Sequence, residues 1–206
     1  MKTRAQLATL LAVPLLASFA LAACSTATTS PAPGGMMSQS SPDAHGMMGD
    51  SEDASASDIA FAQMMIPHHE QAVEMSKLAP ERASSSFIRD LASRIQGAQQ
   101  PEIDQMAAWL QDWGVPRMTM MESMTAHGGH GMAGIVSDAD MTRLEQAKGA
   151  KFDQLYAQFM IDHHLGAIAM AKGVEDSSNP EVAALAKAII SAQQDEIAQM
   201  REFLKQ

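Results

Sequence analysis

The stretch FAQMMIPHH at residues 61–69 decides the fold, because it returns 95 positions later as YAQFMIDHH at residues 156–164. A second stretch also occurs twice: residues 98–103 read AQQPEI and residues 192–197 read AQQDEI, an offset of 94. A repeat of this length indicates one structural unit that the chain uses twice. We therefore expect two copies of a helix-loop-helix hairpin.

Capping and helix-breaking residues set the expected limits of the helices. Pro80 ends the first helix, Gly114 ends the second, and Asn179 followed by Pro180 begins the last. No stretch shows the sustained alternation of a β-strand, so the fold class is all-α. Two hairpins joined by a longer crossover make a four-helix bundle. The expected segments are the repeats at about 58–113 and 150–206, the crossover loop at 114–137, and helices at about 57–79, 85–114, 150–174 and 180–206.

The N-terminal residues have the composition of an export signal. Lys2 and Arg4 precede an apolar run from Leu7 to Ala22, and Cys24 follows directly after Ala23. The stretch LAAC at residues 21–24 resembles the lipobox of bacterial lipoproteins, which implies a lipid on Cys24. A plain signal peptide with an accidental cysteine is the alternative. We expect a signal peptide at 1–23, a Ser-, Pro- and Gly-rich tether at 24–56 and a folded part at 57–206, outside the cytoplasm and lipid-anchored to the cell membrane.

The composition excludes several classes of function. The chain has 206 residues and a formal net charge of −10, which becomes −12 when Lys2 and Arg4 leave with the signal peptide. Such an acidic protein attracts cations and is a poor candidate for binding nucleic acid. Cys24 is the only cysteine, so core packing or metal must stabilise the fold in place of disulfides. The sequence contains no nucleophile triad, phosphate loop or dinucleotide fingerprint.

Two histidine pairs lie on the apolar side of their predicted helices. Helical spacing puts His68 and His69 on one arc with apolar residues, and the second copy repeats this arrangement for His163 and His164. The opposite face of the first helix takes Gln63, Pro67, Glu70, Glu74 and Lys77. An inward-facing histidine is usually a hydrogen-bonded core residue, but four of them at matched positions favour a metal site.

A glutamate interrupts the apolar row of the second helix in each hairpin. Glu102 lies between Ile95 and Trp109, and Glu196 occupies the matching place in the other copy. A buried carboxylate costs several kcal/mol unless it is paired, protonated or bound to metal. We therefore expect these glutamates to face the histidines across each hairpin. Neither copy has the Glu-x-x-His pair of the di-iron proteins.

The methionines indicate a soft metal. Nine of the 18 lie in the tether or the crossover loop, where core packing does not explain them. Thioether and imidazole ligands together suit Cu(I), whereas carboxylate-rich sites suit harder ions. Methionines within the helices are more often core residues that fill irregular gaps. The candidate residues for secondary capture of metal are His45, Met47, Met48, Met120, Met121, Met124, His127, His130 and Met132.

With MIPHHEQA at residues 65–72, MIDHHLGA at 160–167 and the two QQxEI blocks, the chain resembles the DUF305 family over roughly Asp58 to Leu204. The resemblance implies a ferritin-like four-helix bundle, export from the cytoplasm and, as in several members, copper tolerance through Cu(I) binding. Glu70 and Gln71 become Leu165 and Gly166 in the second copy, which breaks the symmetry. Carried over by position, the family signature falls on Met65, His68, His69, Met75, Met160, His163, His164 and Met170.

The leading hypothesis is a membrane-anchored protein that sequesters Cu(I) or passes it on, without catalytic turnover. Its candidate metal ligands are those of the signature together with Glu102 and Glu196, and iron or zinc are the other metals this set could take. The second hypothesis is a ferritin-like oxidase that uses iron or copper. The third is a structural or interaction lipoprotein in which histidine and glutamate form only a hydrogen-bond network. A homo-oligomer and a copper-handling partner both stay open.

Overall fold

The computed structural model describes residues 54–126 and 133–206, and these residues form helices joined by turns and loops, without strands. The all-α fold class is therefore confirmed. Among the described helices, none combines the length and the apolar character that a membrane span requires. The helices are α1 (Ala56–Lys77), α2 (Ala79–Arg82), α3 (Ser86–Asp112), α4 (Met120–Ala126), α5 (Asp138–Gln146), α6 (Ala150–Lys172) and α7 (Pro180–Phe203).

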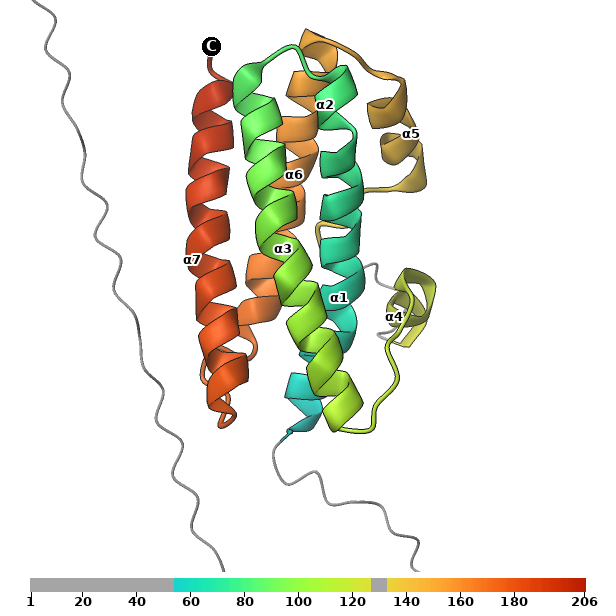
Figure 1. Ribbon diagram of the computed structural model, residues 1–206, viewed down its shortest axis with the longest axis vertical. Helices are drawn as coiled ribbons and strands as arrows, with labels where there is room; N and C mark the ends of the chain where they lie inside the picture. Colours follow the sequence, from blue (N-terminus) through green and yellow to red (C-terminus); the bar gives the residue numbers. More distant parts are fainter. Residues whose placement is uncertain (1–53, 127–132) are drawn as a thin grey trace, which may run out of the picture. The chain divides into compact units, whose positions relative to one another are not determined.

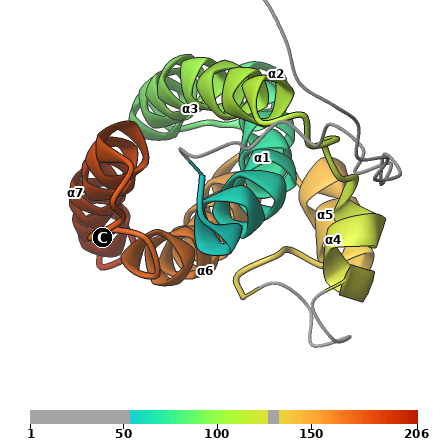
Figure 2. The same ribbon diagram turned by 90° about the horizontal axis from the view of Figure 1, so that it is seen from below.

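Four long helices form the bundle. α1 packs along α3 in the first hairpin, α6 packs along α7 in the second, and the two hairpins meet chiefly where α1 lies against α6 (Figure 1). Seen along the bundle axis, the helices follow one another around the core in the order α1, α3, α7 and α6, while α4 and α5 lie outside this ring on the side of α1 (Figure 2). The predicted bundle of two repeated hairpins is confirmed.

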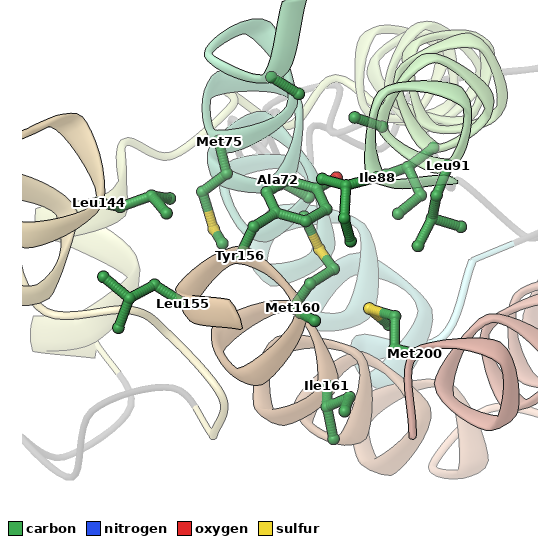
Figure 3. Packing of buried hydrophobic residues seen from close by; sticks show 14 of the residues in the cluster. Ala72, Met75, Ile88, Leu91, Leu144, Leu155, Tyr156, Met160, Ile161 and Met200 are labelled. Carbon is green, nitrogen blue, oxygen red and sulfur yellow. The ribbon is translucent and has the colours of Figure 1, made fainter. Parts of the chain in front are cut away.

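The hydrophobic core between the hairpins is rich in methionine. Met75 of α1, Met160 of α6 and Met200 of α7 lie around the ring of Tyr156, and all four side chains are buried (Figure 3). Flexible thioethers fill the irregular space between helices that cross at an angle. The sequence-based interpretation of these methionines as core residues is confirmed, and it does not conflict with a ligand role for Met75 or Met160.

The helices end slightly earlier than the sequence predicts. α1 stops at Lys77, and Pro80 instead lies in the first turn of the short helix α2. α3 stops at Asp112, two residues before Gly114, whose φ of +68° is the left-handed conformation that terminates helices. Asn179 caps α7 as predicted, because its side chain accepts hydrogen bonds from the backbone of Glu181 and Val182.

Two buried aspartates at equivalent repeat positions join the hairpins. Asp58 of α1 accepts hydrogen bonds from the backbone N–H of Ser55 and from the hydroxyl of Ser177, in the turn between α6 and α7. Asp153 of α6 accepts from the backbone of Ser84 and Ser85, at the start of α3. Both aspartates lie in the first turn of their helices, and each one ties its helix to the other hairpin.

The crossover covers a face of α1 that the sequence places on the side away from the core. Gln63 donates a hydrogen bond from Nε2 to the carbonyl of Pro116, at 2.9 Å, and its own carbonyl accepts from the hydroxyl of Ser123. Gln63 and Pro67 are consequently buried. Helical periodicity alone could not show this, because the covering segment lies some fifty residues away in the chain.

Candidate metal centre

The four histidines of the repeated signature meet in the core of the bundle. His68 and His69 come from α1, His163 and His164 come from α6, and all four side chains are fully buried. The rings of His68 and His163 face each other across the α1–α6 contact with their centroids 3.8 Å apart and their planes inclined by 40°. The rings of His163 and His164 are 6.4 Å apart.

The second histidine of each pair is held by the glutamate that the sequence predicts. His69 Nε2 lies 2.7 Å from Glu102 Oε2 within the first hairpin, and His164 Nε2 lies 2.7 Å from Glu196 Oε2 within the second. The glutamate side chains are 20% and 15% exposed, so they lie at the edge of the core, less buried than the apolar row suggests. The predicted pairing of histidine with glutamate is confirmed, whereas full burial of the carboxylates is not.

The remaining ring nitrogens have no hydrogen-bond partner in the described part of the chain. These buried atoms are Nδ1 of His68, His69 and His164, together with both nitrogens of His163. A glutamate or a carbonyl holds Nε2 of the first three rings, and an imidazole that donates through Nε2 keeps its Nδ1 lone pair for a ligand. Partners of this kind orient histidines that bind metal.

Burial favours the neutral form of the two central imidazoles. It lowers the pKa of His68 from 6.5 to about 3, with smaller contributions from the charges of His69 and His164 and an opposing one from the Ala133 carbonyl. Burial also holds the pKa of His163 well below its usual range, helped by the charges of the other three histidines and opposed by a contact with the backbone of His68. Neutral imidazole is the form that binds metal.

The signature methionines lie on both sides of the histidines along their helices. Met65 and Met160 are fully buried and precede His68 and His163 by three residues, which places them on the same helical face one turn away. Met75 and Met170 follow the same histidines by seven residues, about 10 Å along the helix. Met65 and Met160 are therefore the thioethers closest to the imidazoles along the chain.

The donor atoms suit a soft ion better than a hard one. In residues 54–126 and 133–206, no three His, Cys, Asp or Glu side chains converge in the arrangement of a metal site. The buried groups on this stretch of α1 and α6 are instead imidazoles with unpartnered nitrogens and, one helical turn away along the chain, the thioethers of Met65 and Met160. Ions such as Cu(I) accept few ligands and prefer nitrogen and sulfur. The residues present thus fit Cu(I), with Nδ1 of the histidines and Sδ of Met65 and Met160 as the candidate donors.

The predicted capture residues have different positions. Met120 lines a cleft of about 450 Å³ between α1, α4 and α5, together with Met141 and carboxylates that include Glu70 and Glu74. Met121 is 78% exposed on α4. Met124 lies on the same helix. Cys24, His45, Met47, Met48, His127, His130 and Met132 lie outside the described residues.

Sequence reasoning missed two features of the centre. One is the carbonyl of Ala133, which accepts a hydrogen bond from His68 Nε2 at 3.3 Å. The other is a pair of buried amides at equivalent positions, Gln99 and Gln193, which have orphaned polar atoms one helical turn before Glu102 and Glu196. The repeated QQxEI block carried a signal for the amides, but nothing in the sequence marked Ala133.

Comparison with known proteins places this arrangement in a family. The family model described as a domain of unknown function, DUF305, matches residues 58–204. No curated protein matches the sequence. A DUF305 crystal structure from Streptomyces coelicolor is 34% identical, with a TM-score of 0.66, covering 72% of this chain and 92% of that one. A DUF305 fragment from Deinococcus radiodurans is 32% identical, with a TM-score of 0.66, covering 74% and 97%.

A third similar structure is that of a protein solved with metals. CopM in its Cu(II)-bound form is 33% identical to this chain, with a TM-score of 0.62, covering 72% of this chain and 95% of CopM. CopM has also been solved in Cu(I)-bound and Ag-bound forms. The family model alone matches residues 58–204, which include nearly all of the described bundle. This chain belongs to the DUF305 family.

Proposed function

We propose that this protein binds Cu(I) outside the cytoplasm and sequesters it or passes it on, with the four-histidine centre as its binding site. The observation that carries the proposal is the set of four buried imidazoles whose Nδ1 atoms have no partner in the described residues, while Glu102, Glu196 and a carbonyl hold Nε2 of three of them. The likeness to CopM, solved with copper and silver, supports a soft metal as the cargo.

The acidic surroundings support capture of a cation. The cleft between α1, α4 and α5 is lined by four carboxylates, two methionines and Pro67, which immediately precedes His68. Carboxylates raise the local concentration of cations, and thioethers are among the ligands that Cu(I) prefers. In this proposal the tether and the crossover collect the ion and the histidine centre holds it.

The test is an anaerobic Cu(I) titration against a competing chelator. Replacing His68, His69, His163 and His164 together by Ala should remove the tightest site, because it deletes all the nitrogen donors of the core. The matched control replaces His45, His127 and His130, the three histidines outside the described residues, and should keep that site. Unchanged affinity and stoichiometry in the core variant would overturn the proposal.

Further measurements on the same proteins distinguish the alternative functions. Histidine–glutamate pairs on opposed helices of a ferritin-like bundle are the observation that favours an oxidase. Two bound irons with oxygen consumption would support that activity. A purely structural network predicts that no metal raises the melting temperature of the wild-type protein, since a ligand stabilises only the state that binds it.

We also propose that Cys24 carries the lipid anchor. The LAAC stretch supports it, and one structural relative is named a candidate secreted protein. Several acyl chains on one residue hold a protein stably, since each buried methylene adds about 0.8 kcal/mol. Cys24→Ser should move the protein from the membrane fraction to the soluble extracytoplasmic fraction and abolish labelling by a radioactive fatty acid. Continued sedimentation of the variant with membranes would contradict the anchor.

A further inference from the structure

The crossover returns to the bundle as a strap, residues 133–136, that lies on the surface of α6. A Cβ atom added to Gly166 of α6 would come within 1.8 Å of the carbonyl oxygen of Ala133. Gly134 has a φ of +82°, and a Cβ there would lie 2.5 Å from the carbonyl oxygen of Asp162. Two glycines in contact therefore let the strap touch the helix backbone directly.

One side chain of α1 holds the other end of the strap. Gln71 Nε2 donates a hydrogen bond to the carbonyl of Val136, and the backbone N–H of Val136 donates to Gln71 Oε1, each at 2.9 Å. The single amide thus satisfies both backbone groups of Val136, whose side chain is buried. A bidentate contact of this kind sets the position of the strap along α1.

Gln71 and Gly166 are equivalent positions of the repeat, 95 residues apart, and both are devoted to the strap. The chain crosses from one hairpin to the other only once, so the two equivalent positions have different roles. The side chain of Gln71 binds the strap, and the missing side chain of Gly166 leaves room for it. The histidines become unequal as a result. His68 Nε2 donates a hydrogen bond to the Ala133 carbonyl, whereas neither ring nitrogen of its counterpart His163 forms a hydrogen bond to the strap.

We infer that Gln71 is a positioning residue for metal binding: by clamping the strap it fixes His68 with Nε2 protonated, so that His68 ligates a soft monovalent cation through Nδ1. A carbonyl oxygen can only accept, so the proton of the neutral ring must reside on Nε2. His163 has no such constraint and is the adaptable member of the facing pair. This inference rests on the proposed function, in which the histidine centre binds Cu(I).

The test compares Gln71→Leu with Gln158→Leu, the same chemical change at an exposed position of α6. Residues that orient metal-binding histidines typically contribute about 10- to 100-fold to affinity, so Gln71→Leu should weaken Cu(I) binding by about that factor in anaerobic competition. Gln158→Leu should leave the affinity unchanged. Gln71→Glu keeps the acceptor for Val136 N–H and loses the donor, so its affinity should fall between those of wild type and Gln71→Leu.

A second measurement needs no metal. Nitrogen-15 NMR of the imidazoles should show His68 of the wild-type protein as a single Nε2–H tautomer, and Gln71→Leu should convert it to a mixture. Failure of the wild-type protein to bind Cu(I) would overturn the proposed function. The tautomer of His68 would then still test whether Gln71 positions this histidine through the strap. Wild-type binding with an unchanged affinity and an unchanged His68 tautomer in Gln71→Leu would overturn the role of Gln71 alone.

Discussion

Gly166→Ala is expected to lower the free energy of unfolding by about 3 kcal/mol and the melting temperature by roughly 6–12 °C. The added Cβ would lie 1.8 Å from the Ala133 oxygen and 2.5 Å from the Ala133 carbonyl carbon. Both are backbone atoms, so no side chain can rotate away to make room. The strap or α6 must move, and either movement strains the contacts of Gln71 and His68 with the strap.

Gly97→Ala is the matched control for this substitution. Gly97 lies on the exposed side of α3, and a Cβ there meets no atom within 4 Å. Alanine favours a helix over glycine by about 1 kcal/mol, so this variant should be slightly more stable than the wild-type protein. Thermal and urea unfolding of both variants measure the difference. Equal stability of the two variants would show that the strap does not rest on α6 as described.

Acid is expected to destabilise the metal-free protein well above the pH at which carboxyl groups titrate. In the unfolded chain His68 has its usual pKa of 6.5, whereas in the folded protein burial lowers that pKa to about 3. Between these values the unfolded state binds more protons, so stability falls as the pH falls. His163 acts in the same direction, because its pKa is also lowered by burial. The contribution of neutral His68 to the free energy of unfolding is complete above pH 6.5 and is lost progressively as the pH falls to 3.

The magnitude is large for one residue. A shift from 6.5 to about 3 corresponds to about 5 kcal/mol for His68 once both states are protonated, and to about 2 kcal/mol at pH 5. Urea unfolding in chelator at pH 7, 6 and 5 measures this slope. Replacing His68 and His163 by Gln should flatten it. If the free energy of unfolding of the wild-type protein did not change between pH 7 and pH 5, this would contradict neutral burial of these rings.

Local signals predicted the parts of the site that lie on single helices. The spacing of His68 and His69 relative to Phe61 and Met65 shows that they face the core, because an α-helix repeats every 3.6 residues. The repeat then places His163 and His164 in the same way. The cost of burying Glu102 among apolar residues predicted a histidine partner across the hairpin, and the structure supplies it at 2.7 Å.

The sequence by itself determined the two hairpins, the inward-facing histidines and the glutamates opposite them, because helix periodicity, capping and burial cost are properties of short stretches. Only the tertiary structure decided that the ring of His68 contacts the ring of His163, that the carbonyl of Ala133 holds His68, and that the crossover buries Gln63. These contacts join residues that are 53 to 95 positions apart. The path of a crossover leaves no periodic trace in the sequence, since each of its contacts depends on where the packed helices place distant backbone atoms.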